Sequence, residues 1–155
     1  MLENIPAVLK SLATAGSALK AFADMRARTR GEARALVEEL KENSRLCWLV
    51  IEEDVPVEQI IPDLSSVEYD RLNKTGFDFD ALKRKKISLQ AGLQDSDLAS
   101  WAGKPTRALV ENIYDKIKNL KTTYRHAPRS EKRRWKTRIF NIQKRILLLL
   151  EHCRN

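Results

Sequence analysis

Two side chains near the end of the sequence are of the types that can cleave RNA without a metal ion. Arg145 and His152 lie seven residues apart in the run RIFNIQKRILLLLEHCRN, residues 138–155. Seven residues are close to two helical turns, so both side chains fall on one flank of a helix. A histidine can accept the 2′-hydroxyl proton and an arginine can hold the phosphate. The alternative is that both are charged residues at the edge of a core-facing stripe.

This spacing, with ILLLLE between the two residues, resembles the signature of the HEPN superfamily. The resemblance implies a small all-α protein. For many members it also implies a metal-independent ribonuclease that acts as a dimer, in phage defence or in toxin–antitoxin pairs. On this resemblance Arg145 and His152 are the catalytic residues. The chain departs from the pattern at Ile146, where active members commonly have a polar residue.

A second candidate site is the basic segment KNLKTTYRHAPRSEKRRWKTR, residues 118–138. The whole chain has a formal net charge of +8, and residues 116–155 contain 13 Lys and Arg but only two acidic residues. Such a cluster favours phosphate contacts with nucleic acid, with RNA preferred over DNA, or contact with an acidic protein. The predicted anion-binding residues are Lys121, Arg125, Arg129, Lys132, Arg133, Arg134, Lys136 and Arg138.

The remaining motifs exclude several classes of site. The acidic runs EED (52–54) and DFD (78–80) have no histidine or second acidic cluster at helical spacing to complete a metal site. Cys47 and Cys153 do not form a C-x-x-C pair, so we expect buried structural thiols. No glycine-rich phosphate loop, G-x-S-x-G or H-E-x-x-H motif occurs. We therefore expect no metal and no cofactor.

The elements that must position these residues are helices. The chain has 155 residues, 43% of them hydrophobic, with only five glycines and five prolines, which is too few turns for an all-β fold. Apolar residues recur at three- and four-residue steps, which predicts one all-α domain over residues 1–155, a bundle of five or six helices. The long helices are expected at about 5–28, 32–54, 105–125 and 131–153, with the last two forming an antiparallel hairpin.

Turn signals mark the ends of these elements. Gly31 is expected to break the chain between the first two helices, and Ser130 to cap the last one. Residues 55–103 form an irregular region of short helices. One of these helices is expected to have Ser65 or Ser66 as its N-cap and Gly76 as its C-cap.

The last helix has more apolar surface than one stripe can bury, and Leu148 is expected to be left over beside its polar flank. This favours a homodimer through the C-terminal helices, or docking into a complex. The longest apolar runs, LCWLVI and ILLLL, are far shorter than the ~20 residues of a membrane span. The start, MLENIPAVLK, does not have the pattern of a secretory signal, so we expect a cytoplasmic protein without membrane contact.

Two hypotheses stay open on the sequence. The first is a non-catalytic helical module that binds nucleic acid or an acidic protein through its basic corner. The second is a HEPN-like ribonuclease, or an inactive relative, so the sequence leaves open whether the protein is an enzyme.

Overall fold

The computed structural model describes residues 5–88, 93, 96–130 and 134–154, and every regular element in this part of the chain is helical. The six α-helices are α1 (Ala15–Arg28), α2 (Ala33–Glu53), α3 (Val57–Ile60), α4 (Val67–Lys74), α5 (Thr106–His126) and α6 (Trp135–Arg154). The part of the chain that the structure describes also contains the short 3-10 helices η2 (Ala7–Leu12), η3 (Ile61–Asp63), η4 (Phe79–Leu82) and η6 (Ala99–Trp101). One buried apolar cluster includes side chains from Ile5 to Cys153, so the predicted all-α bundle is confirmed.

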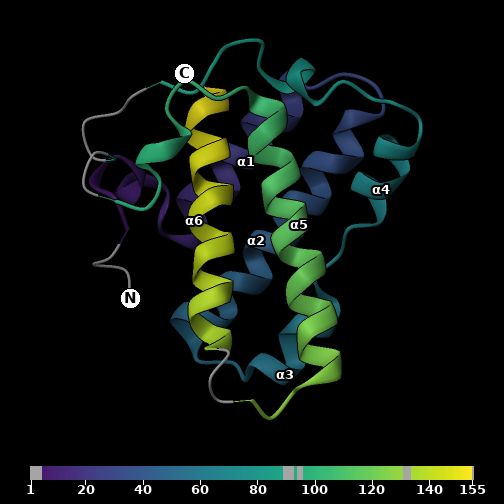
Figure 1. Ribbon diagram of the computed structural model, residues 1–155. Coiled ribbons are helices and arrows are strands. Elements are labelled where there is room, and N and C mark those ends of the chain that lie inside the picture. The colour runs from purple at the N-terminus through teal and green to yellow at the C-terminus, as the bar shows by residue number, and fades with distance from the viewer. Residues whose placement is uncertain (1–4, 89–92, 94–95, 131–133, 155) are drawn as a thin grey trace.

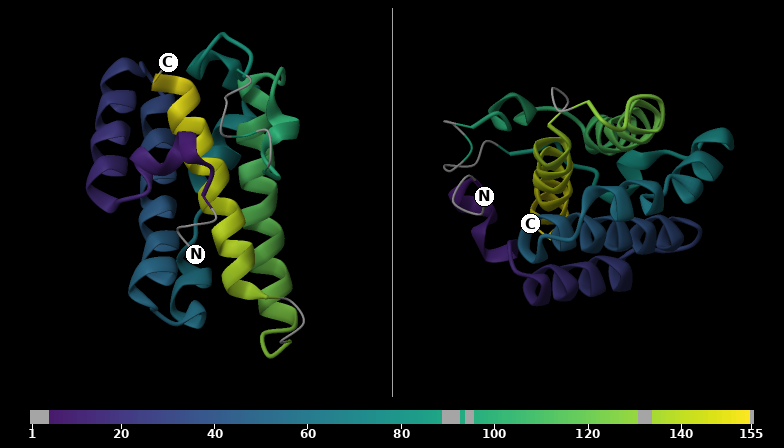
Figure 2. Two further views of the ribbon diagram at one scale, coloured as in Figure 1. Left: turned by 90° about the vertical axis from the view of Figure 1, so that its left-hand side faces the viewer. Right: turned by 90° about the horizontal axis from the view of Figure 1, so that it is seen from below.

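The two C-terminal helices form the predicted antiparallel hairpin. Figure 1 shows α5 and α6 side by side, with α1 and α2 behind them. Viewed from below, α6 lies between α5 on one side and the pair α1–α2 on the other (Figure 2). The helix α6 is therefore the central element of the bundle, in contact with α1, α2, α5 and η2.

This central position corrects one prediction about α6. Leu148 is 1% exposed, not left over at the surface. Four other elements surround α6, and none of its apolar side chains is exposed. The surplus apolar face that suggested a dimer through this helix is thus buried within the chain itself, and the dimer stays a prediction without that support. None of the described helices combines the length and the apolar character that a membrane crossing requires.

The N-terminal segment is also different from the single helix expected over 5–28. It is divided into η2 and α1 at Ala13 and Thr14. The Thr14 hydroxyl accepts a hydrogen bond from the Ser17 backbone N–H at 3.2 Å, and so starts a new helix. The break at Gly31 is where it was predicted, with a left-handed φ of 66° that favours glycine.

The start of α6 is later than expected. The helix begins at Trp135, and Arg134 before it has φ 49°, which is not helical. Ser130 lies five residues before Trp135, which is too far from the first turn of α6 to be its N-cap, so the predicted cap is wrong. Its N–H instead donates to the Ala127 carbonyl in the turn after α5, at 3.2 Å.

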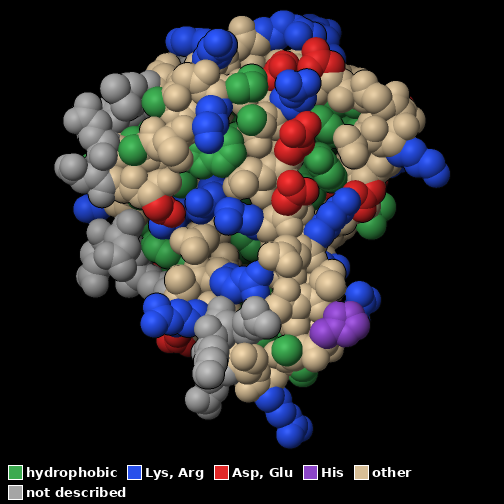
Figure 3. Space-filling view, in the orientation of Figure 1, with side chains coloured by type: hydrophobic (Ala, Val, Ile, Leu, Met, Phe, Trp, Pro, Cys, Tyr) green, Lys and Arg blue, Asp and Glu red, His purple; other side chains and the backbone are tan. Residues whose placement is uncertain are grey.

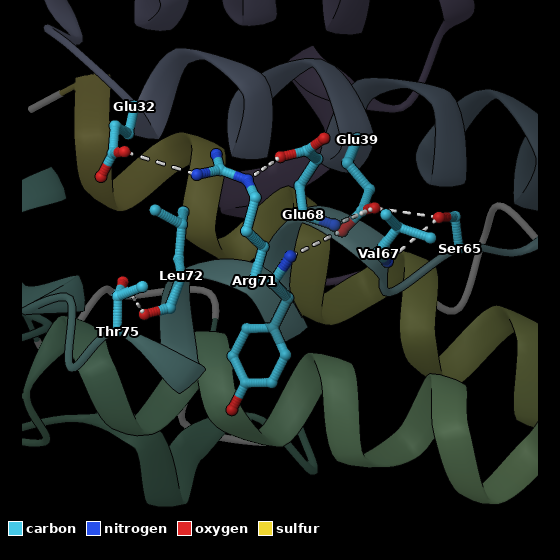
Figure 4. A network of polar contacts seen from close by, with 9 residues as sticks. Glu32, Glu39, Ser65, Val67, Glu68, Arg71, Leu72 and Thr75 are labelled. Atoms are coloured by element: carbon cyan, nitrogen blue, oxygen red, sulfur yellow. Dashed lines mark hydrogen bonds and ion pairs between the residues drawn. The ribbon is translucent and has the colours of Figure 1, made fainter.

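Helix α4 is held by a carboxylate from a distant part of the chain. Buried Glu39 of α2 accepts hydrogen bonds from the backbone N–H groups of Glu68 at 2.8 Å and Tyr69 at 3.2 Å (Figure 4). Ser66 is the N-cap residue, but its side chain makes no capping bond; Ser65 Oγ accepts from the Val67 N–H at 3.3 Å. Gly76, with φ 78°, follows the C-terminus of α4 as predicted.

Candidate nucleic-acid interface

The turn between α5 and α6 gathers the predicted basic residues at one end of the bundle. Helix α5 ends at His126, and Pro128 cannot continue it. The rings of Tyr124 and Trp135, one on each helix, meet edge to face with centroids 5.2 Å apart. This contact joins the end of α5 to the start of α6 at the turn.

The structure divides the eight predicted anion-binding residues into groups. Arg125, Arg129 and Arg134 are exposed and have no carboxylate partner among the described residues; we call these three the basic turn. Three others have local partners: Lys121 donates to the Leu64 carbonyl, Lys136 pairs with Asp54 at 2.8 Å, and Arg138 lies over the Trp135 ring at 5.6 Å. Lys132 and Arg133 lie outside the described residues.

A groove opens beside the basic turn. It has a volume of about 620 Å³ and lies between α5 and the segment before α4. Its lining combines cations with an aromatic and an apolar surface: Lys118, Lys121, Arg125, Tyr124, Ile61 and Pro62. The one acidic lining residue, Asp70, is paired with Lys118. Basic side chains are present at the lower end of the face seen in Figure 3, where the hairpin turns.

Arg145 is held mainly by contacts within the protein. Its side chain is 11% exposed; Nη1 donates to the Asn141 carbonyl at 2.9 Å and Nη2 lies 3.6 Å from Oδ2 of Asp97. Asp97 also accepts from Lys144 at 2.8 Å. Burial lowers the pKa of Arg145, and Asp97 opposes that shift. The buried Nε of Arg145 has no hydrogen-bond partner among the described residues.

His152 is buried in a different environment. It is 5% exposed, and its Nε2 lies 2.8 Å from Oγ1 of Thr106. That hydroxyl is also 2.6 Å from the Lys83 carbonyl, which can only accept, so Thr106 donates its single proton to Lys83. The Nε2–H of His152 therefore donates to Thr106, and this nitrogen is not free to act as a base. Burial and then the charge of Lys83 lower the pKa of His152; a hydrogen bond with the Lys85 backbone opposes this shift, and the charge of Lys85 adds a smaller lowering.

Arg145 and His152 consequently do not meet. They are separated by about 10 Å along the axis of α6, and each has its own partners. The chain alone does not bring the two predicted catalytic side chains into one cleft. The catalytic role that the resemblance implies stays a prediction.

One basic cluster was missed by the sequence analysis. Lys83, Arg84, Lys85 and Lys86 lie at the opposite end of the hairpin and, with Asp80 and Thr106, line a pocket of about 260 Å³. The signal was present as four consecutive basic residues. The run lies in the irregular region of short helices expected over residues 55–103.

Comparisons with known proteins add no family to these observations. No family model matches the chain, and no curated protein or solved structure is similar to it. Among the described residues, no three His, Cys, Asp or Glu side chains are grouped so that they could hold a metal ion.

Proposed function

We propose that the protein is a nucleic-acid-binding module that holds single-stranded RNA at the turn between α5 and α6. The observation that carries this proposal is the basic turn itself. Arg125, Arg129 and Arg134 are exposed, close in sequence to a fixed helical hairpin, and have no carboxylate partner among the described residues. Arginine forks of this kind bind phosphate oxygens.

The adjoining groove supports a single strand over a duplex. Tyr124 lines it and is half-buried, with its ring held edge to face by Trp135. An aromatic ring fixed beside cations is the platform on which an unpaired base stacks, while a base within a duplex is not accessible to it. Lys118 and Lys121 at the same groove have partners in the protein, so they shape the wall and add positive charge.

The test is binding of a fluorescent 12-nucleotide uridine-rich RNA, measured by anisotropy over a series of salt concentrations. The site variant is Arg125→Gln, Arg129→Gln and Arg134→Gln together. The matched control removes three exposed cations elsewhere, through Lys10→Gln, Lys20→Gln and Arg34→Gln. We expect the site variant to lose affinity and to reduce the slope of log K against log salt by about 2, since each contact to a single strand contributes about 0.7.

Equal losses in both variants would mean that only the net charge matters, and would overturn a defined interface. Absence of RNA binding by the wild type at low salt would point to an acidic protein partner instead. Metal-free cleavage of the RNA that disappears in His152→Ala, with the fold intact, would favour the ribonuclease implied by the HEPN resemblance.

A further inference from the structure

A small polar pocket lies in the seam between α5 and α6, away from the basic turn. It has a volume of about 70 Å³ and is lined by Lys116, Asn119, Arg138, Asn141 and Ile142; we call it the seam pocket. Figure 3 shows basic side chains at the centre of the face that α5 and α6 present. At this size the pocket admits only a small ligand.

Two cationic side chains line the seam pocket, Lys116 from α5 and Arg138 from α6. Lys116 has no ion-pair partner among the described residues. The charge of Asp97 raises the pKa of Lys116, but that carboxylate also pairs with Lys144 and Arg145. Burial lowers the pKa of Lys116, and the positive charges of Arg145 and Arg138 lower it further. Lys116 therefore lies in a half-buried seam where the neighbouring positive charges disfavour its own charge.

The neutral members of the pocket supply hydrogen-bond donors. Oδ1 of Asn119 accepts from the Thr123 hydroxyl at 3.3 Å, which leaves its amide nitrogen with two N–H groups to donate. Asn141 lies on the facing helix, and its backbone carbonyl accepts a hydrogen bond from Nη1 of Arg145. Donors thus approach the pocket from both helices.

We propose that the seam pocket binds a phosphate group, held by Lys116 and Arg138 with the Asn119 amide. A tetrahedral oxyanion has enough acceptor oxygens for a lysine, an arginine fork and an amide at once, and it neutralises the charge that these residues bring together. The group belongs either to the backbone of a bound nucleic acid or to a small phosphorylated molecule. The proposal goes beyond RNA binding at the basic turn, since the pocket can bind phosphate whether or not RNA is present.

The experiment compares thermal unfolding of the wild type, Lys116→Met and Lys20→Met in sodium pyrophosphate and in sodium chloride of equal ionic strength. Lys20 is exposed on α1 and has no partner among the described residues, so Lys20→Met removes the same charge without touching the seam. Pyrophosphate stabilises most proteins slightly by exclusion from their surface, and that general effect is common to all three chains. We expect Lys116→Met alone to lose the additional rise in Tm, and its affinity for pyrophosphate to fall by about tenfold or more.

A loss of stability in Lys116→Met is not expected to account for the result. Lys116→Met removes a like-charge contact, so without ligand its Tm is expected to equal or exceed that of the wild type. Side-chain amide NMR signals of Asn119 and Asn141 should shift with pyrophosphate in the wild type and not in Lys116→Met. The same rise in Tm in all three chains, or no rise above chloride in the wild type, overturns the proposal.

Two further measurements distinguish the phosphate pocket from RNA binding at the basic turn and identify the source of the phosphate. The triple variant of the basic turn (Arg125→Gln, Arg129→Gln and Arg134→Gln) should keep the rise in Tm with pyrophosphate even if it no longer binds RNA. The two proposals can therefore fail independently. If the phosphate comes from RNA, Lys116→Met lowers the salt slope of RNA binding by about 0.7. If it comes from a small molecule, RNA affinity is unchanged in Lys116→Met while the pyrophosphate effect is lost; both results support the pocket.

Discussion

The Nε2 atom of His152 donates to the Thr106 hydroxyl at 2.8 Å, across 46 positions of sequence. Through Thr106 the histidine is linked to the Lys83 carbonyl, which joins the end of α6 to the start of α5 and to the basic loop before it. A residue that looked like a catalytic base in the sequence is thus part of a buried chain of hydrogen bonds. Its effect on stability can be measured directly.

The stability of the protein should depend on pH through His152. Burial lowers its folded-state pKa below the ordinary value of 6.5, so the folded state holds it neutral while the unfolded state takes up a proton. The stabilisation is complete above pH 6.5 and is lost as pH falls below it, by at most about 1.4 kcal/mol per pH unit, until the folded pKa is passed. Urea denaturation of wild type and His152→Gln between pH 8 and pH 5 should show this decline only in the wild type. Parallel curves would contradict it.

Leu148→Ala should destabilise the protein strongly. The side chain is 1% exposed in the central helix, and truncation of a buried leucine costs about 2–5 kcal/mol. Leu19→Ala is the matched control, because Leu19 is 47% exposed on α1 and its truncation should cost no more than about 0.5 kcal/mol. Urea denaturation gives both values. If Leu148→Ala leaves stability unchanged but alters the mass in sedimentation, the side chain belongs to an interface between copies of the chain.

Glu39→Ala should loosen α4. The carboxylate satisfies two backbone N–H groups at the start of that helix and the Ser65 hydroxyl, and leaving such buried donors unpaired costs about 1–3 kcal/mol. The neighbouring Glu38 is the control, since its ion pairs among the described residues are with exposed Arg26 and half-buried Lys41, and Glu38→Ala should cost at most about 1 kcal/mol. Hydrogen exchange should rise in α4 for Glu39→Ala and not for Glu38→Ala. Equal exchange in both variants would remove the capping role.

The two thiols should be unreactive in the folded protein. Burial raises the pKa of Cys47 and of Cys153 to about 12, so almost no thiolate is present at pH 8. Iodoacetamide should add no mass to the native chain within the time that labels both cysteines in urea. Rapid labelling of Cys153 alone would show that the end of α6 opens in solution.

The sequence by itself determined the helices. Repeated apolar residues at three- and four-residue steps are a local pattern, and they placed α2, α5 and most of α6 to within a few residues. Gly31 and Gly76 marked two breaks correctly because positive φ is a property of a single residue. The basic turn was visible for the same reason, since its members lie within one short segment.

Only the tertiary structure decided how those helices pack and which distant residues contact one another. The burial of Leu148 depends on how many elements surround α6, and a helical wheel shows one helix at a time. The cap of α4 comes from Glu39, about 30 residues away, and the partner of His152 from another helix. The seam pocket combines Lys116 of α5 with Arg138 of α6. Contacts between distant residues depend on packing, which sums many weak interactions over the whole chain, and no local pattern contains that sum.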